Sequence, residues 1–210
     1  MAQTHVHFYL VQHGSKETTD GDPGLSAAGI KQARLTARHL ASLRIARLYS
    51  SPLRRARETA EIIARELGLA LHLDGRLRER MNWGDGASPQ TRDAFLAEWD
   101  RATWDRDFAP SSGDSSHAAG ARIASLLNEL ARQGGGDVAL VTHGGVTVDL
   151  LRNLFTDEVI RGRNPDVDVI TSGIAGCAIT HLLRYGDSYE LRALASVAHL
   201  PAQRRTHRRY

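Results

Sequence analysis

Two stretches of the sequence share one arrangement: an apolar run, then a histidine, then a glycine. The first is YLVQHG, which ends at His13 and Gly14, and the second is LVTHGG, which contains His143 and Gly144. Short apolar runs that stop at such turn residues predict buried strands. In open parallel sheets, ligands bind beyond the carboxyl ends of the strands. We therefore expect both histidines to face one crevice of an α/β fold.

Strand-like and helix-like segments alternate along the rest of the chain. We predict strands at 5–11, 45–49, 71–73 and 137–142, helices at about 27–41, 52–67, 123–130 and 146–155, and closing strands at 167–171, 175–182 and 189–194. Ser26 has the residue type of a helix N-cap, and Gly68 and Gly134 are of the type that ends helices. Strands that alternate with helices predict a three-layer α/β/α sandwich around a mainly parallel sheet.

The length of 210 residues fits one domain with a short excursion. We predict a single domain over residues 1–200, in which about 80–115 leave the core and cover part of it as a lid. Trp83, Phe95, Trp99 and Trp104 lie in this charged stretch. They either line a pocket or form a small local core that holds the excursion together. Residues 201–210, PAQRRTHRRY, form a basic tail that we expect to be disordered.

The composition limits the class of protein. No apolar run approaches the ~20 residues of a membrane span, and we expect no secretory signal at the N-terminus. Cys177 is the only cysteine, which excludes an intramolecular disulfide and fits a cytoplasmic protein. The net charge is only +3 and the tail holds four arginines, so we do not expect nucleic-acid binding. His5 and His7 share a strand face, but no carboxylate or cysteine is spaced to complete a metal site. The oligomeric state stays open.

Two histidines at one crevice suit phosphoryl chemistry. A neutral imidazole is a good nucleophile at neutral pH, because its pKa lies near 6.5, and it can hold a phosphoryl group covalently. The arginines of SPLRRARETA begin a predicted helix, where they face the same crevice and suit phosphoryl oxygens. Glu79, in the loop LRERMNWGDG, is the candidate acid for a leaving alkoxide. The opposing interpretation of each residue is structural: a loop histidine, an exposed helix arginine or a loop salt-bridge partner.

Six motifs occur in a fixed order over about residues 8–200. They are LVQHG at 10–14, GLSAAGIKQA at 24–33, SPLRRARETA at 51–60, LRE at 77–79, THGG at 142–145 and AHL at 198–200. Each motif alone is weak, but together they are specific. With them the sequence resembles the histidine phosphatase superfamily, in its phosphoglycerate mutase-like branch. The resemblance implies a phosphoglycerate mutase-like fold and an enzyme that acts on a small phosphorylated substrate without a metal or cofactor.

The resemblance also implies roles for the residues at the crevice. His13 would be the phosphorylated nucleophile, and Gly14 would allow the close turn that lets phosphate reach it. Arg55 would bind the phosphoryl oxygens. His143 would donate a further hydrogen bond, and Glu79 would be the acid-base group.

Gln12 departs from the family pattern, which has arginine before the histidine. Glutamine offers one NH₂ donor group and no charge. By analogy with deleted oxyanion donors, the change costs about 2–4 kcal/mol of transition-state stabilisation, or ~10²- to 10³-fold in rate. Three interpretations stay open: Gln12 still donates in a slower phosphatase, Lys16 swings in to restore the charge, or the protein binds phosphate compounds without hydrolysing them. Gln12, Lys16 and Gly144 complete the candidates for phosphate binding.

Two features favour hydrolysis over phosphoryl transfer to a second substrate group. Only residues 15–23 separate the first His-Gly pair from GLS, so the longer mutase-type segment that grips a sugar-acid phosphate is missing. The excursion at 80–115 is also modest in length. Gly113-Asp114-Ser115 resembles the family's Gly-Glu-Ser, but its acid is one methylene shorter, and we do not count it among the site residues. We therefore expect a phosphomonoesterase with a phosphohistidine intermediate, and a phosphoglycerate mutase-like phosphotransferase is the alternative.

Two other classes of protein compete with this enzyme. A binding or regulatory module would keep the pocket without turnover, and a nucleic-acid binder would depend on the basic tail. The presence of His13, Arg55, Glu79 and His143 favours catalysis. If the aromatic residues of the excursion form a pocket, an aromatic or otherwise apolar phosphomonoester would suit it. The sequence does not identify the substrate.

Overall fold

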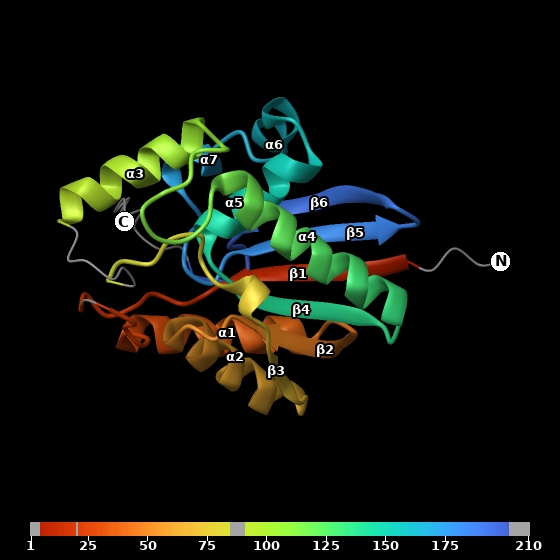
Figure 1. The fold of residues 1–210 in the computed structure, drawn as a ribbon. Coiled ribbons are helices and arrows are strands. Elements are labelled where there is room, and N and C mark those ends of the chain that lie inside the picture. Colours follow the sequence, from red (N-terminus) through yellow and green to blue (C-terminus); the bar gives the residue numbers. More distant parts are fainter. Residues whose placement is uncertain (1–4, 20, 85–90, 202–210) are drawn as a thin grey trace.

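One six-stranded sheet runs through the computed structural model, which describes residues 5–19, 21–84 and 91–201. Its strand order is β3-β2-β4-β1-β5-β6 (Figure 1). The strands are β1 (His5–Gln12), β2 (Ile45–Ser50), β3 (Leu71–Leu73), β4 (Asp137–Thr142), β5 (Ile179–Tyr185) and β6 (Ser188–Ser196). The first four strands pair in parallel, whereas β5 and β6 are antiparallel to their neighbours. The sheet is therefore mixed, and its parallel part holds both histidine-terminated strands.

Helices cover both faces of this sheet (Figure 1). They are α1 (Ala27–Ala41), α2 (Arg54–Leu67), α3 (Arg92–Trp104), α4 (Ser116–Gln133), α5 (Gly144–Leu154), α6 (Asp157–Arg163) and α7 (Val169–Ser172), with a 3₁₀ turn η1 at Gly75–Leu77. The helices α1 and α2 pack against each other on one face, and α4 and α5 do so on the other. The predicted three-layer α/β/α architecture is confirmed.

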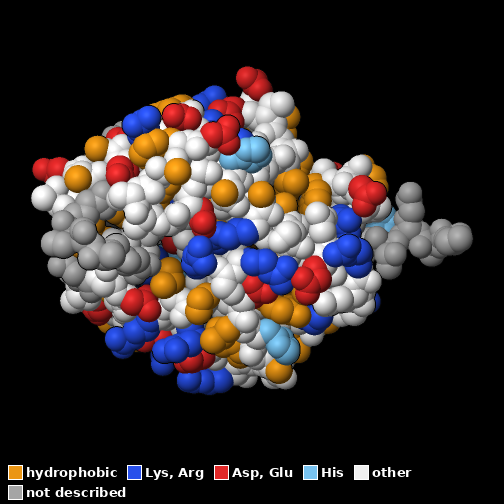
Figure 2. All heavy atoms as spheres, viewed as in Figure 1, with side chains coloured by type: hydrophobic (Ala, Val, Ile, Leu, Met, Phe, Trp, Pro, Cys, Tyr) orange, Lys and Arg blue, Asp and Glu red, His pale blue; other side chains and the backbone are white. Residues whose placement is uncertain are grey.

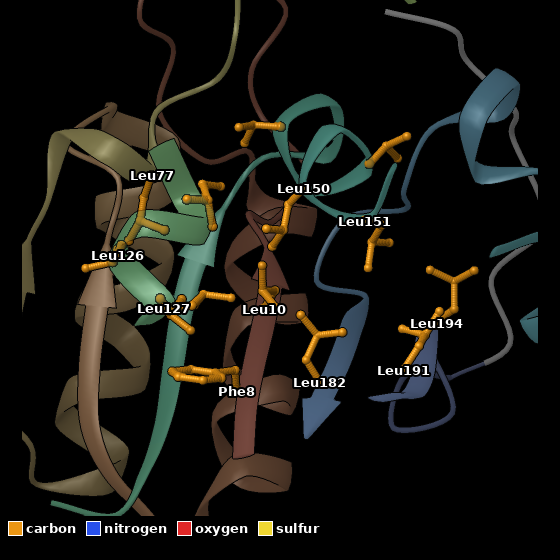
Figure 3. Close-up of a cluster of buried hydrophobic side chains, with 14 of the residues drawn as sticks. Phe8, Leu10, Leu77, Leu126, Leu127, Leu150, Leu151, Leu182, Leu191 and Leu194 are labelled. Atoms are coloured by element: carbon orange, nitrogen blue, oxygen red, sulfur yellow. The ribbon is translucent and has the colours of Figure 1, made fainter. Parts of the chain in front are cut away.

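The alternation of side chains along β1 divides the core between the two faces. Phe8 and Leu10 point toward α4 and α5, where they meet Leu127 and Leu150 (Figure 3). Val11 belongs to the opposite cluster, beneath α1 and α2. Both faces of β1 are buried, so its register in the sheet is fixed. A slip of one residue would move every side chain of the strand to the opposite face of the sheet. The position of the residue that follows β1 is thereby fixed.

Local signals set the ends of several helices as the sequence predicts. The Ser26 side chain accepts a hydrogen bond from the backbone of Gly29 at the start of α1. Gly68 ends α2 with a positive φ of 66°. Gly134 is the C-cap of α4. Each is a position where the residue type satisfies free backbone groups or adopts a left-handed conformation at low cost.

Two predicted closing strands differ from the structure. Residues 167–171, which we predict as a strand from their β-branched content, contain the start of α7 instead. Asp168 explains this outcome, because its side chain caps the turn by accepting from the backbone of Ile170. The strand predicted at 175–182 begins later, at Ile179, after a turn in which Cys177 has a φ of 60°.

The excursion at 80–115 contains a helix, α3, that the sequence analysis did not predict. Phe95 and Trp99 are buried with Met81, and Trp83 packs against this group. These residues thus form the local core that was one of the two alternatives. Trp104 is not part of that cluster and is 60% exposed. Within 80–115, residues 85–90 lie outside the described residues, as do 202–210 of the basic tail.

Charges of both signs share the surface of the described chain. On the face drawn in Figure 2, Lys and Arg side chains lie interspersed with Asp and Glu side chains. In the described ranges, no helix is both long and apolar enough to cross a membrane. The same part of the chain contains no group of three or more His, Cys, Asp or Glu side chains placed to hold a metal ion.

Candidate active site

The two strand-end histidines lie beside each other. Gln12 pairs with Thr142 at the end of the parallel β1–β4 ladder, and the backbone N–H of His13 donates to the Thr142 carbonyl at 3.0 Å. This register places His13 and His143 at the same edge of the sheet. Their ring centroids are 5.1 Å apart, with the planes inclined at 62°. The convergence expected from the two sequence motifs is therefore present.

Hydrogen bonds around His13 assign its proton to Nδ1. This nitrogen lies 2.7 Å from the carbonyl oxygen of Gly14, an acceptor to which only an N–H can donate. The other ring nitrogen, Nε2, then carries a lone pair. Nε of Arg55 donates to it at 3.2 Å, and the side-chain amide of Gln12 lies at the same distance. The side of the ring that carries the lone pair thus faces the donors of Arg55 and Gln12.

Both histidines are held in the neutral state. Burial, followed by the positive charge of Arg55, lowers the pKa of His13 to about 3. The same two causes, with His13 third, hold the pKa of His143 well below its usual value. Lys16 adds to both effects, which places its ammonium group within electrostatic range of the two rings. A neutral His13 has the free lone pair that attack on phosphorus requires.

Arg55 reaches the crevice from the first turn of α2. Its side chain is 5% exposed and lies 3.5 Å from a carboxylate oxygen of Asp22. Arg54 and Arg57, its neighbours in the sequence, are 58% and 47% exposed. Arg55 is therefore not an exposed helix arginine like its two neighbours, which was the opposing interpretation.

Glu79 follows η1, and its carboxylate faces the N-terminus of α5. It accepts hydrogen bonds from the backbone N–H of Gly145 at 3.1 Å and of Val146 at 2.7 Å. The N–H of Arg80 donates to the same group at 3.0 Å. A helix N-terminus offers unpaired N–H groups to a carboxylate, so this contact fixes the orientation of the side chain. The helix starts at Gly144, two residues before the predicted start, and this earlier start creates the contact.

Close packing explains the glycines at 14 and 145. A Cβ atom at Gly14 would lie 2.7 Å from the carbonyl oxygen of Gly29. The backbone N–H of Gly14 also donates to the Thr59 hydroxyl at 3.1 Å. At Gly145, a Cβ would lie 2.5 Å from the Trp99 ring and 2.7 Å from Glu79. A larger residue at position 14 would displace the backbone of Gly29. A larger residue at position 145 would displace the Trp99 ring and the Glu79 carboxylate.

Gln12 and Lys16 occupy different environments near this centre. Gln12 is 7% exposed, and its Oε1 has no hydrogen-bond partner among the described residues. Lys16 pairs through its backbone with Leu25, and the residue is partly exposed at the surface. Burial, then the charges of Arg55 and Arg92, lower the pKa of Lys16. Lys16 therefore belongs to the positively charged surroundings of Arg55.

The sequence did not predict three of the residues that contact this centre. Ser51, which is buried, lies 2.8 Å from Nε2 of His143 through its hydroxyl. Asp22 pairs with Arg55, and Thr59 accepts from the backbone beside His13. Ser51 and Thr59 lie inside the motif SPLRRARETA, so their position in that motif was the available signal.

Asp114, which we excluded from the site, is engaged elsewhere. Its carboxylate lies 2.9 Å from Nε of Arg122 and 3.3 Å from Arg78. Arg122 in turn donates to the carbonyl oxygens of Arg76 and Glu79. Asp114 therefore supports the loop that carries Glu79, and its side-chain contacts within the described residues are with Arg78 and Arg122.

Comparisons with known proteins agree with this geometry. The family model described as histidine phosphatase superfamily (branch 1) matches residues 8–195. A glucosyl-3-phosphoglycerate phosphatase of Mycolicibacterium vanbaalenii is 33% identical over 170 residues, which cover 70% of this chain and 72% of that protein. The structure of a mycobacterial glucosyl-3-phosphoglycerate phosphatase with VO3 has a TM-score of 0.69 and 26% identity, covering 90% of this chain and 98% of the other.

The fold extends to more distant proteins. Phosphoglycerate mutase from Bacillus anthracis superposes with a TM-score of 0.71 at 17% identity, over 94% of this chain and 96% of the other. The phosphoglycerate mutase-like fold is thereby confirmed. The family match and the named relatives support a phosphatase. With its six motifs in order and two histidines at adjacent strand ends, the chain belongs to branch 1 of the histidine phosphatase superfamily.

Proposed function

We propose that the chain hydrolyses phosphomonoesters through a phosphoryl group held on Nε2 of His13. One observation carries the proposal. The Nδ1–H of His13 is committed to the carbonyl of Gly14, while Nε2 meets Arg55 and Gln12 in the crevice shared with His143. This arrangement leaves a lone pair at a positively charged, donor-rich point, which is what attack on a phosphate group requires.

The proposed reaction has two steps. Nε2 of His13 attacks phosphorus, the bond to the leaving oxygen breaks, and Glu79 in its protonated form gives that oxygen a proton. Water then attacks the phosphohistidine, Glu79 takes a proton from the water, and His13 returns to its neutral state with release of phosphate. Arg55, Gln12 and the backbone N–H of Gly144 would hold the phosphoryl oxygens in both steps.

His143 supplies a further donor in this proposal. When the Ser51 hydroxyl donates to Nε2 of His143, the proton of that ring lies on Nδ1. In the described part of the chain, Nδ1 is buried without a hydrogen-bond partner. A buried donor of this kind gains most from a partner, so a phosphoryl oxygen between the two rings would satisfy it.

A phosphate-binding module without turnover is the second candidate, and Gln12 is the observation that favours it. The family's arginine at this position binds the phosphoryl group. If that contact tightens only in the transition state, replacing the arginine with glutamine weakens transition-state stabilisation more than it weakens binding of the phosphate compound. A phosphotransferase of the mutase type is a further alternative. We also propose that residues 1–200 form one domain and that the protein is cytoplasmic.

The test is phosphate release from p-nitrophenyl phosphate together with mass spectrometry of the quenched protein. We expect turnover and a phosphoryl group on residue 13, both lost in His13→Ala. The matched variant His72→Ala should keep both, because His72 is exposed on β3 and is not one of the site residues. Vanadate or phosphate binding with no release from any phosphomonoester would favour the binding module. A phosphorylated His13 that reacts with a second substrate group in preference to water would favour the phosphotransferase.

A further inference from the structure

A cavity of about 290 Å³ lies between α3, α5 and α7, next to the catalytic centre. More of its surface is apolar than polar, and its uncharged polar side chains are those of Thr103 and Thr171. The apolar side chains are those of Leu96, Trp99, Trp104, Val148, Val169 and Ile170. Ligand pockets in proteins are typically of this kind: about 300 Å³ or more, apolar, with a few polar groups at fixed points.

The cavity borders the start of α5, which holds the proposed acid Glu79. Gly144 and Gly145 line it, and Gly144 directly follows His143. The N–H of Gly145 holds the Glu79 carboxylate at 3.1 Å. A side chain at position 145 would collide with Trp99 and Glu79. Trp99 and Glu79 thus pack directly against Gly145, and through Gly144 and Gly145 the cavity adjoins the place where a leaving group would depart next to Glu79.

Trp104 marks the rim of this cavity. Trp83, Phe95 and Trp99 of the excursion pack in one cluster, whereas Trp104 is 60% exposed. Hydrophobic side chains are visible on the surface where α3 lies, at the upper left of Figure 2. Exposed aromatic surface beside an apolar hollow is a common mark of a ligand site.

The polar groups of the cavity constrain the charge of its occupant. Arg80 is paired with Asp149 at 2.9 Å, and Arg152 is paired with Asp157 at the same distance. Both arginines of the lining are therefore neutralised, and the exposed Asp100 adds a negative charge. An anionic occupant would meet no unbalanced cation among these lining residues.

Asp149 adds one directed contact. It is 1% exposed, and its Oδ2 has no hydrogen-bond partner within the described ranges, while Oδ1 binds Arg80 and Ser116. An unpaired buried acceptor is costly, and a donor on a bound molecule would satisfy it.

We propose that this cavity binds the leaving group of the substrate, and that this group is uncharged, mainly apolar, longer than one ring and able to donate a hydrogen bond to Asp149. The proposal rests on the proposed phosphomonoesterase function and names the substrate class. It separates this chain from enzymes whose leaving group carries a carboxylate, because the cavity offers that charge no free cation.

A matched pair of substrates tests the proposal. Phenyl phosphate and 4-biphenylyl phosphate have leaving groups of similar chemistry, but only the second extends into the cavity. We expect kcat/KM for the biphenylyl ester to exceed that for the phenyl ester by about tenfold or more, and O-phosphoserine to be the poorest of the three. We also expect 4-phenylphenol, which has no phosphate, to inhibit competitively and to bind in a calorimeter.

Two variants locate the effect. Val148→Phe fills the cavity and Trp104→Ala removes its rim, so each should lower the biphenylyl-to-phenyl ratio about tenfold and weaken 4-phenylphenol binding. Trp104 is exposed, so its variant remains informative if Val148→Phe does not fold. Leu73→Ala is the control, since Leu73 is 51% exposed on β3 and lies outside the lining. Its ratio should equal that of the wild type.

The outcomes separate this proposal from the proposed function. Hydrolysis of all three esters with equal kcat/KM, or a ratio unchanged in both variants, would overturn the leaving-group pocket and keep the phosphatase. Binding of 4-phenylphenol that is lost in Val148→Phe, with no hydrolysis of any ester, would keep the cavity as an apolar site and remove the phosphatase. A preference for O-phosphoserine would show that a small zwitterionic leaving group is favoured over an apolar one and would contradict the proposal.

Discussion

At position 12 this chain has glutamine where the family pattern has arginine. The amide nitrogen of Gln12 lies 3.2 Å from Nε2 of His13, but Oε1 has no partner among the described residues. One neutral donor thus stands where a charge-assisted donor would bind the phosphoryl group. We expect Gln12→Arg to raise kcat/KM for p-nitrophenyl phosphate by about 10²-fold, since such contacts contribute about 2–4 kcal/mol.

Lys16 decides how the result at position 12 is interpreted. If Lys16 already supplies the missing charge, Lys16→Ala should lower the wild-type rate strongly and the rate of Gln12→Arg weakly. Such a coupling is measured by the double-mutant cycle of the two positions. An unchanged rate in Gln12→Arg together with an unchanged rate in Lys16→Ala would show that neither position limits catalysis.

Glu79 is predicted to act on the leaving oxygen, and this role depends on the leaving group. Glu79→Gln keeps the shape but cannot transfer a proton. We expect it to slow hydrolysis of phenyl phosphate by about 10²- to 10⁴-fold, and that of p-nitrophenyl phosphate much less, because p-nitrophenolate leaves without protonation. Steady-state rates for the two esters give the comparison. An equal loss with both esters would assign Glu79 a structural role through its contacts with Gly145 and Val146.

Among the structural elements, the loop after η1 depends on one buried ion pair. Nη1 of Arg80 lies 2.9 Å from Asp149 on α5, and the two side chains are 3% and 1% exposed. The Arg80 guanidinium also lies 4.0 Å from the centroid of the Trp99 ring and donates to Thr103, both on α3. One side chain therefore connects the loop that carries Glu79 to two helices.

Breaking this pair should destabilise the protein measurably. Removal of one partner leaves a buried charge without compensation, which costs about 3–5 kcal/mol. We expect Arg80→Met to lower the free energy of unfolding in urea by that amount. Arg57→Met is the control, because Arg57 and Glu61 are 47% and 43% exposed, and such pairs contribute about 1 kcal/mol or less. Similar losses in the two variants would contradict the special role of Arg80.

The sequence predicts those elements whose signals are local. Strand β1, the N-cap at Ser26 and the glycine stop at Gly68 all follow from residue types within a few positions. The segment 167–171 was mispredicted because valine, isoleucine and threonine favour strands, while the cap at Asp168 favours a turn of helix. Helix α3 was missed because its few apolar residues pack within the excursion and form no long amphipathic stripe.

For the whole molecule, topology explains which site residues could be predicted. Parallel neighbours β1 and β4 end at the same edge of the sheet, so two strand-end histidines had to meet there once the sheet was parallel. The contact of Glu79 with α5 and the cavity beside α7 join segments that are far apart in the chain. No local pattern encodes such contacts, because they depend on how the excursion packs across the carboxyl edge.

The site also affects the stability of the whole molecule, because it keeps His13 neutral in the folded state. Burial, then Arg55, lowers the pKa of His13 to about 3, whereas an unfolded histidine titrates near 6.5. As the pH falls below about 6.5, the unfolded chain therefore binds a proton that the folded chain does not, and folding stability is lost. The slope from one such histidine approaches about 1.4 kcal/mol per pH unit between about pH 6 and pH 3.

The variant His13→Gln isolates this contribution. Buried Asp149, whose pKa burial raises to about 6, has the opposite effect on stability, but it is present in both proteins and cancels in the difference. We expect the stability advantage of wild type over His13→Gln to shrink by about 1 kcal/mol from pH 6 to pH 5 in urea unfolding, and to stay constant above pH 7. The exposed His72→Gln should follow the wild type throughout. A difference between wild type and His13→Gln that does not change with pH would mean that His13 titrates alike in both states, and that the crevice does not hold it neutral.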